Sequence, residues 1–342
     1  MFVGIRELRS AKGRFALITV TVALVALLVS FLSGLTGGLE HRNIAALDTL
    51  GGTSAVVSGT GDPSLDRSAL TEEQIGAIAE KGPFTSVAFS RSTVGEEPVS
   101  VAAVSGDRPE VPSPAPGEVI VSSALAETAG ITTGDSVDLW GGTKTVAGVS
   151  GDDWYSHQPL MWANGAEWAA QPQAAEQGAA TTVIADAPAD ALEGAAAGTT
   201  VVAASDLPET MSAYKAENTT LTTINWMLMA IAALVTGAFF TVWTVQRIPD
   251  IATLKALGAT TASLMRDALG QAFVVLVIGV GVGLAITVAA ATAIGSGLPF
   301  VLTAGTTVFP AIILLALGLA GAGAAMMFIR SASPLSALGG AR

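Results

Sequence analysis

Residues 15–39 read FALITVTVALVALLVSFLSGLTGGL, an uncharged run of 25 residues that ends only at Glu40. A helix needs about 20 apolar residues to cross the hydrocarbon core of a bilayer. Three further uncharged runs, at residues 223–245, 268–294 and 308–329, meet the same condition. The sequence therefore predicts a membrane α-helical protein with four transmembrane helices.

The first run follows basic residues and ends on small ones, a pattern that a cleaved signal peptide shares. The apolar region of a signal peptide spans only about 7–15 residues, so we expect residues 15–39 to be retained as a membrane helix. The small residues at its end, which permit close approach of another helix, are Ser33, Gly34, Gly37 and Gly38.

Composition separates a basic membrane part from an acidic soluble part. Of all residues, 51% are hydrophobic and 13% charged, whereas soluble proteins carry about 25% charged residues. Residues 40–222 hold 7 Lys and Arg against 25 Asp and Glu, a net charge of −18, whereas the rest of the chain is net +6. No basic patch suits nucleic acid. Because cysteine is absent, disulfides, thiolate nucleophiles and cysteine-based metal sites are excluded.

Basic residues flank the four helices unevenly: they lie before the first, between the second and third, and after the fourth. Lys and Arg are enriched in cytoplasmic flanks. We therefore predict a multi-pass plasma-membrane protein with both termini in the cytoplasm, and with residues 40–222 and the short outer hairpin 295–307 on the extracytoplasmic side. The basic residues are Arg6, Arg9, Lys12 and Arg14, then Arg247, Lys255 and Arg266, and finally Arg330.

Three segments are cytoplasmic in this topology. Residues 1–14 mix apolar and basic side chains and predict an amphipathic segment at the membrane interface. Residues 246–267 connect the second and third helices as a coupling loop. Residues 330–342 form a short tail.

Residues 40–222 predict an extracytoplasmic α+β domain inserted between helices 1 and 2. A capping box in residues 71–74 predicts the start of a helix, and residues 209–218 predict a stalk that runs into the second transmembrane helix. Alanine-rich and glycine-rich residues 163–198 are expected to be mostly loosely structured surface. Short strands are expected near residues 84–89, 99–104, 119–121, 137–140, 145–149, 181–185 and 201–203.

The loop after the second helix, residues 246–260, reads QRIPDIATLKALGAT. It resembles the same loop of MacB/FtsX-type ABC transporter permeases, in which an acidic residue, an aliphatic residue and Leu-Lys/Arg-Ala-Leu-Gly-Ala recur. The resemblance spans the whole chain: one helix, a large outer domain and three helices. Further segments that resemble the family are residues 5–9, 117–122, 134–137, 145–149 and 333–335.

The resemblance implies a transporter permease, not an enzyme, that forms a homodimer and works with two copies of a cytoplasmic ABC ATPase subunit. Pro249-Asp250 departs from the Glu-rich pair usual in the family, at the segment on which the ATPase is expected to sit. An amphipathic helix here could insert its apolar ridge into a partner or pack on its own bundle. The implied ATPase-coupling residues are Asp250, Ile251, Leu254, Lys255, Leu257 and Gly258.

The chain carries no nucleotide-binding motif of its own. Walker A requires Gly, four residues and then Gly-Lys-Ser/Thr, and residues 141–145, GGTKT, lack that spacing. No nucleophile with an adjacent base indicates an enzyme active site. ATP is therefore expected to act only through the partner ATPase subunit.

Polar residues at the predicted junction of membrane and outer domain suit a substrate. A carboxylate at this depth is energetically unfavourable where it faces lipid. Where it faces a cleft instead, it indicates a functional site. In a homodimer these residues are expected to line an outer-leaflet cleft for a flat, metal-bearing amphiphile such as haem, with Glu40 or His41 as iron ligand. The candidate substrate-binding residues are Glu40, His41, Arg42, Tyr214, Asn225, Trp226, Met227 and Met229.

These residues also have plainer interpretations. Residues 40–42 could be a solvated helix end, Trp226 an interfacial belt residue, and Met227 and Met229 packing residues. His157 is expected to be a surface histidine rather than a metal ligand.

Size and topology most resemble the haem-exporter permeases of Gram-positive bacteria. The favoured function is therefore efflux of haem as a transported substrate, with no covalently bound cofactor. Two alternatives stay open: a mechanotransmission permease that regulates a cell-wall hydrolase, and an exporter of another hydrophobic drug, peptide or lipoprotein.

Overall fold

The computed structural model describes residues 12–106, 108–295 and 298–326, and the chain divides into two compact units. The residues up to Gly38 and from Leu221 onward form what we call the helical unit, and Leu39–Thr220 form the sheet unit. The predicted cytoplasmic tail at 330–342 and most of the amphipathic segment at 1–14 lie outside the described residues.

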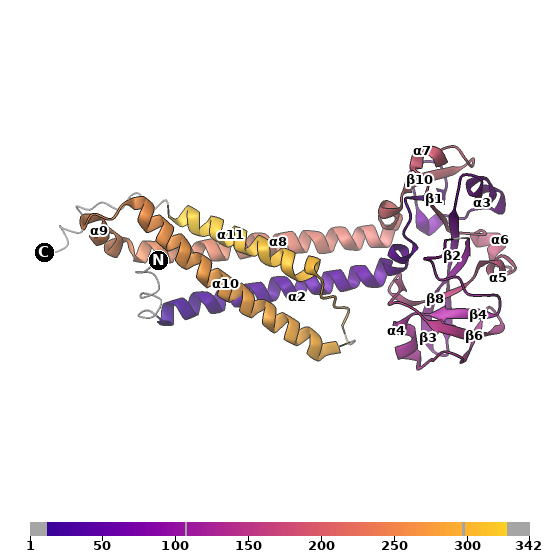
Figure 1. The fold of residues 1–342 in the computed structure, drawn as a ribbon, viewed down its shortest axis with the longest axis horizontal. Helices are drawn as coiled ribbons and strands as arrows, with labels where there is room; N and C mark the ends of the chain where they lie inside the picture. Colours follow the sequence, from indigo (N-terminus) through magenta and orange to yellow (C-terminus); the bar gives the residue numbers. More distant parts are fainter. Residues whose placement is uncertain (1–11, 107, 296–297, 327–342) are drawn as a thin grey trace. The chain divides into compact units, whose positions relative to one another are not determined.

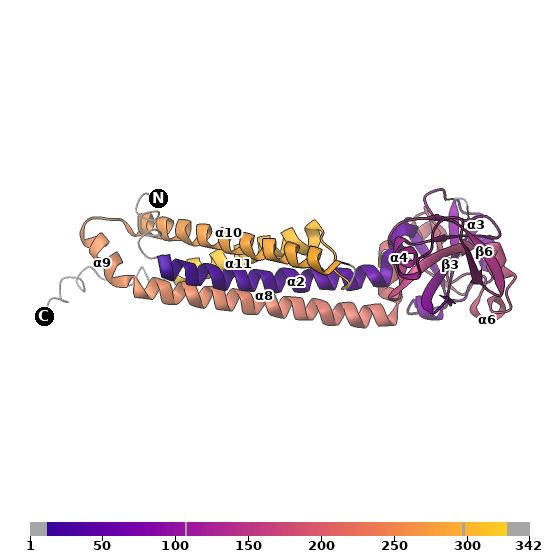
Figure 2. The same ribbon diagram turned by 90° about the horizontal axis from the view of Figure 1, so that it is seen from below.

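Four helices in the described part of the chain are long and apolar enough to cross a membrane. They lie side by side in both ribbon views (Figures 1 and 2). Their bounds are Lys12–Leu50 for α2, Ser212–Gln246 for α8, Thr261–Ile294 for α10 and Phe309–Ala325 for α11, which the π-helical turn η4 (Ala304–Val308) precedes. The predicted fold of four transmembrane helices, with an α+β domain between the first and second, is therefore confirmed.

Glycines let the helices of the helical unit approach one another closely. A Cβ atom at Gly283 of α10 would lie 2.6 Å from the Ala23 carbonyl oxygen of α2. A Cβ atom at Gly321 of α11 would lie 2.9 Å from the Gly237 Cα atom of α8. Larger side chains at these positions would force the helices apart.

The glycines at the end of the first predicted helix contact a loop in the helical unit, not another helix as we expected. Gly38 packs on the backbone of Pro299, and Gly34 packs on the ring of Phe300. The Val301 N–H donates to the Gly34 carbonyl oxygen at 3.1 Å. The predicted outer hairpin thus folds back against α2, and the glycines are needed because a Cβ atom would collide with it.

The sheet unit contains one mixed sheet, with ten strands among the described residues. The strand order is β10-β1-β9-β2-β3-β8-β4-β6-β5, and β7 pairs with β8. Only the β3–β8 and β4–β6 neighbours in this described sheet are parallel. The strands are β1 (Ser54–Ser58), β2 (Phe84–Val94), β3 (Glu97–Gly106), β4 (Glu118–Val121), β5 (Ser136–Leu139), β6 (Gly142–Val149), β7 (Trp154–Tyr155), β8 (Gln158–Asn164), β9 (Thr182–Ala185) and β10 (Thr199–Ala203).

Short helices connect these strands. The predicted capping box opens α3: the Gln74 N–H donates to Thr71 Oγ1 at 3.2 Å, and the Thr71 N–H donates to the Gln74 side chain at 3.0 Å. The helices are η1 (Leu65–Arg67), α3 (Glu72–Ala79), α4 (Ser123–Ala129), α5 (Gly165–Ala169), α6 (Ala174–Gln177), α7 (Ala189–Leu192) and η2 (Ala204–Thr210).

Residues 163–198 are better ordered than their composition predicted. The strand expected near residues 181–185 is present as β9, inside the sheet between β1 and β2. Outside that strand, Trp168 of α5 is buried. The prediction of a loosely structured surface was wrong because alanine is also a frequent interior residue. Ala180, for example, is fully buried.

The last turns of α2 and the first turns of α8 belong to the sheet unit. Ile44, Leu47 and Leu50 of α2 share one buried cluster with Trp162 of β8 and Tyr214 of α8. Burial of these side chains stabilises the attachment of both helices to the sheet, at about 25 cal/mol per Å² of apolar surface. The polar side chains on the same turns are therefore held in place.

Candidate functional site

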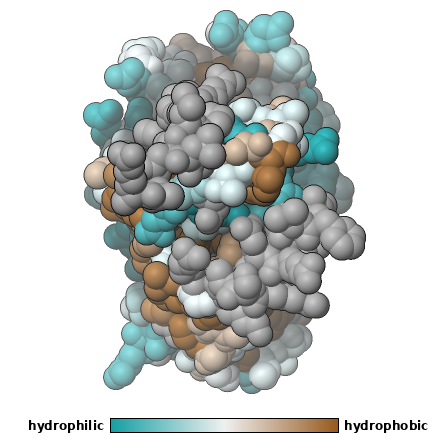
Figure 3. Space-filling model, turned by 90° about the vertical axis from the view of Figure 1, so that its left-hand side faces the viewer, coloured by the Kyte–Doolittle hydropathy of each residue, from teal (hydrophilic) through white to brown (hydrophobic). Residues whose placement is uncertain are grey.

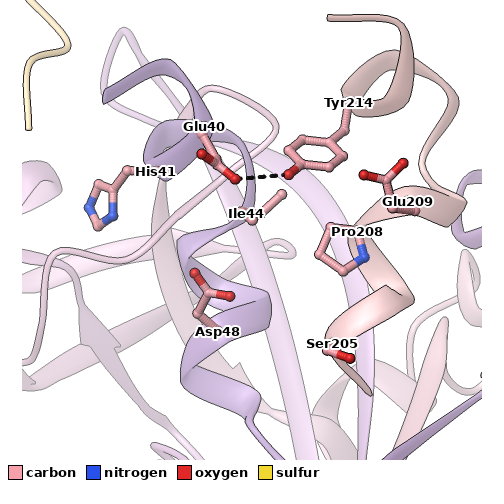
Figure 4. A pocket seen from close by; sticks show the side chains of 8 residues that line it. All are labelled: Glu40, His41, Ile44, Asp48, Ser205, Pro208, Glu209 and Tyr214. Atoms are coloured by element: carbon pink, nitrogen blue, oxygen red, sulfur yellow. Dashed lines mark hydrogen bonds between the residues drawn. The ribbon is translucent and has the colours of Figure 1, made fainter. Parts of the chain in front are cut away.

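A pocket of about 340 Å³ lies where α2, η2 and α8 meet in the sheet unit (Figure 4). Carboxylates and apolar side chains share its wall. Glu40 and Tyr214 face each other across it in Figure 4, and the Tyr214 hydroxyl donates to Glu40 Oε1 at 3.0 Å. The lining residues are Glu40, His41, Ile44, Asp48, Ser205, Pro208, Glu209 and Tyr214.

The pocket combines negative charge with oxygen atoms that can act as metal ligands. Glu40, Asp48 and Glu209 each present a carboxylate, and Tyr214 adds a phenol that is itself buried. Among the residues that the structure describes, no group of three or more His, Asp or Glu is arranged to hold a metal ion. A metal already held in a macrocycle needs only one or two axial ligands, and tyrosine and histidine are among those that haem iron uses.

His41 and Arg42 turn towards the strands rather than only towards the pocket. His41 Nε2 lies 3.1 Å from Asp152 Oδ2. The Arg42 guanidinium lies over the Trp154 ring, 4.6 Å from its centroid, a cation–π contact. Of the candidate iron ligands, Glu40 is therefore the one that pairs with Tyr214 in the pocket, whereas His41 has a carboxylate partner outside it.

The hairpin of β7 and β8 supports this part of α2. Asp153 is buried and accepts from Thr49 Oγ1 at 2.5 Å and from Trp162 Nε1 at 3.0 Å. Tyr155 stacks on Phe89 with ring centroids 3.9 Å apart. Burial raises the pKa of the Tyr155 hydroxyl above its usual range, because the charged form is disfavoured away from water.

The remaining predicted substrate residues lie on α8 in the helical unit. Asn225 Nδ2 donates to Thr36 Oγ1 of α2 at 3.2 Å. Trp226 and Met227 are each 61% exposed, as expected of side chains that face lipid or a ligand. Met229 is buried among the helices, which favours the packing interpretation for that methionine.

The predicted coupling segment forms α9 (Ile248–Ala256). Ile251 is buried and packs with Met326, so its side chain is turned into the helical unit. Leu254 and Lys255 are half-buried, and Leu257 is 79% exposed.

The turn after α9 is made by Gly258, whose φ of +97° suits glycine best. The side chain of Asp250 lies outside the described set. Figure 3 shows apolar side chains beside polar ones on the face at which α9 lies.

Sequence reasoning missed Asp48 and Glu209. It ended the first helix at residue 39, whereas α2 continues to Leu50. Residues four apart share a helix face, so the spacing of Glu40, Ile44 and Asp48 would have placed all three on one wall. No sequence pattern pointed to Glu209. It lies on η2, a short 3-10 helix that is far from α2 in the sequence and reaches it only in the folded chain.

Comparisons with known proteins support the resemblance drawn from the sequence. Residues 222–334 match the FtsX-like permease C-terminal domain. Two Staphylococcus epidermidis proteins, both named as hemin transport system permease HrtB, are 25% identical over 345 residues, which cover 98% of each chain. The Staphylococcus haemolyticus protein of the same name is 24% identical over 346 residues, again covering 98% of each.

Proposed function

We propose that this chain, whose residues 222–334 match the FtsX-like permease C-terminal domain, is an ABC permease that exports a flat, amphipathic, metal-bearing molecule, and that this molecule is haem. A separate ABC ATPase subunit, which the permease family implies, supplies the energy. The chain itself acts as a permease and not as an enzyme.

The observation that carries the proposal is the Glu40–Tyr214 pair. The Tyr214 hydroxyl donates to the Glu40 carboxylate at 3.0 Å. If the phenol oxygen of Tyr214 binds iron, Glu40 is in place to accept its proton. Outer partners of this kind raise the basicity of a metal ligand. The similarity to hemin transport permeases over 98% of the chain supports haem as the metal-bearing molecule.

The charge of the sheet unit favours one orientation of the ligand. Residues 40–222 carry a net charge of −18, and Glu40, Asp48 and Glu209 line the pocket. Haem propionates are anionic and would be repelled there, whereas ferric iron is attracted to oxygen ligands. We therefore propose that the metal centre faces Glu40 and Tyr214 and that the propionates point away from the pocket.

The proposal also includes the assembly and its orientation. Two copies of the permease pair with two ATPase subunits, which dock on α9 and on the exposed Leu257 beside it. The basic flanks of the helices lie in the cytoplasm, and the sheet unit lies on the extracytoplasmic side. Haem then enters from the outer leaflet, where Trp226 and Met227 offer exposed apolar contacts.

Cells that lack their own haem exporter provide the test. Co-expression of the permease with its ATPase should protect them against added haem and lower their haem content. Glu40→Gln and Tyr214→Phe should each weaken protection, because the loss of a metal ligand or of the group that hydrogen-bonds to it lowers metal affinity by about 10–100-fold. Thr143→Ala, which removes only a hydrogen bond to Asp138 in the β5–β6 hairpin, should protect as well as wild type.

Two results would contradict the proposal. If haem content and survival do not change with the wild-type permease and its ATPase, haem is not the substrate. If the sheet unit instead captures a cell-wall hydrolase and no small molecule binds, the mechanotransmission alternative replaces efflux.

A further inference from the structure

The turn between β7 and β8 has an unfavourable backbone. Tyr155 pairs with Gln158, so the turn consists of Ser156 and His157 alone. Both have positive φ values, 51° and 63°. A two-residue turn with two positive φ values normally contains Asn-Gly, because side chains clash in that region. Strain of this kind persists where surrounding contacts maintain it, and it often marks a functional position.

The backbone of this turn is bound to α2. The Ser156 N–H donates to the Asn43 carbonyl oxygen at 3.0 Å, and the His157 N–H donates to the Arg42 carbonyl oxygen at 2.9 Å. Both carbonyl groups lie within the helix Lys12–Leu50. A carbonyl oxygen has two lone pairs, so each can accept from the turn in addition to its helical hydrogen bond.

The His157 side chain of this turn contacts α8. His157 Nε2 lies 3.0 Å from Glu217 Oε2. Asn43 Nδ2 donates to the same oxygen at 3.0 Å, and Asn43 is buried. One carboxylate oxygen therefore joins α2, α8 and the turn. We call Asn43, His157 and Glu217 the clamp.

The clamp lies one helical turn from the pocket on both helices. Asn43 is three residues after Glu40 in α2, and Glu217 is three residues after Tyr214 in α8. Residues three apart are neighbours on a helix surface. A change in the spacing of α2 and α8 at the clamp must therefore also change the Glu40–Tyr214 distance, which is 3.0 Å between oxygens.

We propose that His157, acting through Glu217 and Asn43, positions Glu40 and Tyr214 for the metal centre of the ligand. His157 is thus a positioning residue and does not touch the ligand. The ligand part of this proposal rests on the proposed function, whereas the spacing of the two helices can be measured without any ligand.

The double variant Ser156→Asn with His157→Gly separates positioning from folding. It installs the pair that such a turn prefers and keeps both backbone N–H donors. It removes the imidazole contact and also the Ser156 hydroxyl, which accepts from Arg91 on the exposed surface at 3.4 Å. We expect its thermal stability to equal or exceed that of wild type. Its affinity for ferric haem should fall about tenfold, as when a group that orients a metal ligand is removed, while binding of metal-free protoporphyrin stays within about twofold.

Two single variants complete the ligand experiment. Glu217→Gln keeps an oxygen acceptor for Asn43 and His157 and should restore most of the haem affinity that Glu217→Ala loses. Thr143→Ala, in the β5–β6 hairpin of the same unit, should bind haem as wild type does. The proposal fails if the double variant binds ferric haem as tightly as wild type, or if haem and protoporphyrin weaken equally.

A second measurement needs no ligand. The chain contains no cysteine, so spin labels can be placed specifically at Thr53, which closely follows α2, and at Lys215 of α8, both exposed residues of the sheet unit. The distance distribution between the labels should broaden in the double variant and stay unchanged in Thr143→Ala. An unchanged distribution in the double variant refutes the clamp. A broadened distribution in a permease that binds no haem supports the clamp and refutes the proposed function alone.

Discussion

Replacement of Asp153 by alanine should be the most destabilising single polar change near the pocket. Asp153 is buried and accepts from Thr49 Oγ1 at 2.5 Å and from Trp162 Nε1 at 3.0 Å. Hydrogen bonds to a charged group contribute about 1.5–3 kcal/mol each. The alanine variant also avoids the free-energy cost of burying a carboxylate, which offsets part of that loss. We therefore expect the free energy of unfolding to fall by about 3 kcal/mol in Asp153→Ala.

Unfolding of the sheet unit, followed by tryptophan fluorescence in detergent, measures this loss. A change of about 3 kcal/mol lowers the Tm of a unit of this size by about 6–12 °C. Asp153→Asn keeps one acceptor and should cost less, and Thr49→Val, which removes one donor only, should cost least. If Asp153→Ala unfolds within about 1 °C of wild type, the carboxylate does not hold α2 to the sheet and this reasoning is wrong.

Three further variants test other parts of the structure. Arg108→Met removes the buried guanidinium that donates to the Leu50 carbonyl at the end of α2, at 2.7 Å; thermal unfolding should show a loss of about 2–3 kcal/mol, and Arg108→Lys should lose less. Gly38→Ala places a Cβ against the backbone of Pro299 and should lower the Tm of the purified permease, whereas Gly323→Ala, which has open space, should not. Leu257→Ala truncates a side chain that is 79% exposed, and pull-down titration should show roughly 5–30-fold weaker binding of the ATPase; unchanged binding would place the docking contact elsewhere.

The sequence predicted the membrane helices well because the signal is physical and local. Uncharged runs long enough to span a bilayer must satisfy their backbone groups internally, so they form helices. The Thr71 capping box was predicted for a similar reason, since both of its hydrogen bonds join residues three apart. Features of this kind need no knowledge of distant contacts.

The pocket was predicted only in part because its residues come from three separate elements. Glu40 and Tyr214 were both expected to contact substrate, yet their hydrogen bond joins residues 174 positions apart. Glu209 and the clamp residue Glu217 depend on the same long-range packing. His157 was expected to be a surface histidine, and it is partly exposed, but its carboxylate partner could not be predicted from sequence spacing.

Titration of haem into the purified permease tests the central claim most directly. The wild-type protein in nanodiscs should shift the Soret band of ferric haem and bind it more tightly than empty nanodiscs do. Tyr214→Phe, which keeps the ring and removes only the hydroxyl, should abolish the shift or weaken binding by at least about tenfold. A wild-type Soret spectrum identical to that of empty nanodiscs, or full binding by Tyr214→Phe, would contradict the account.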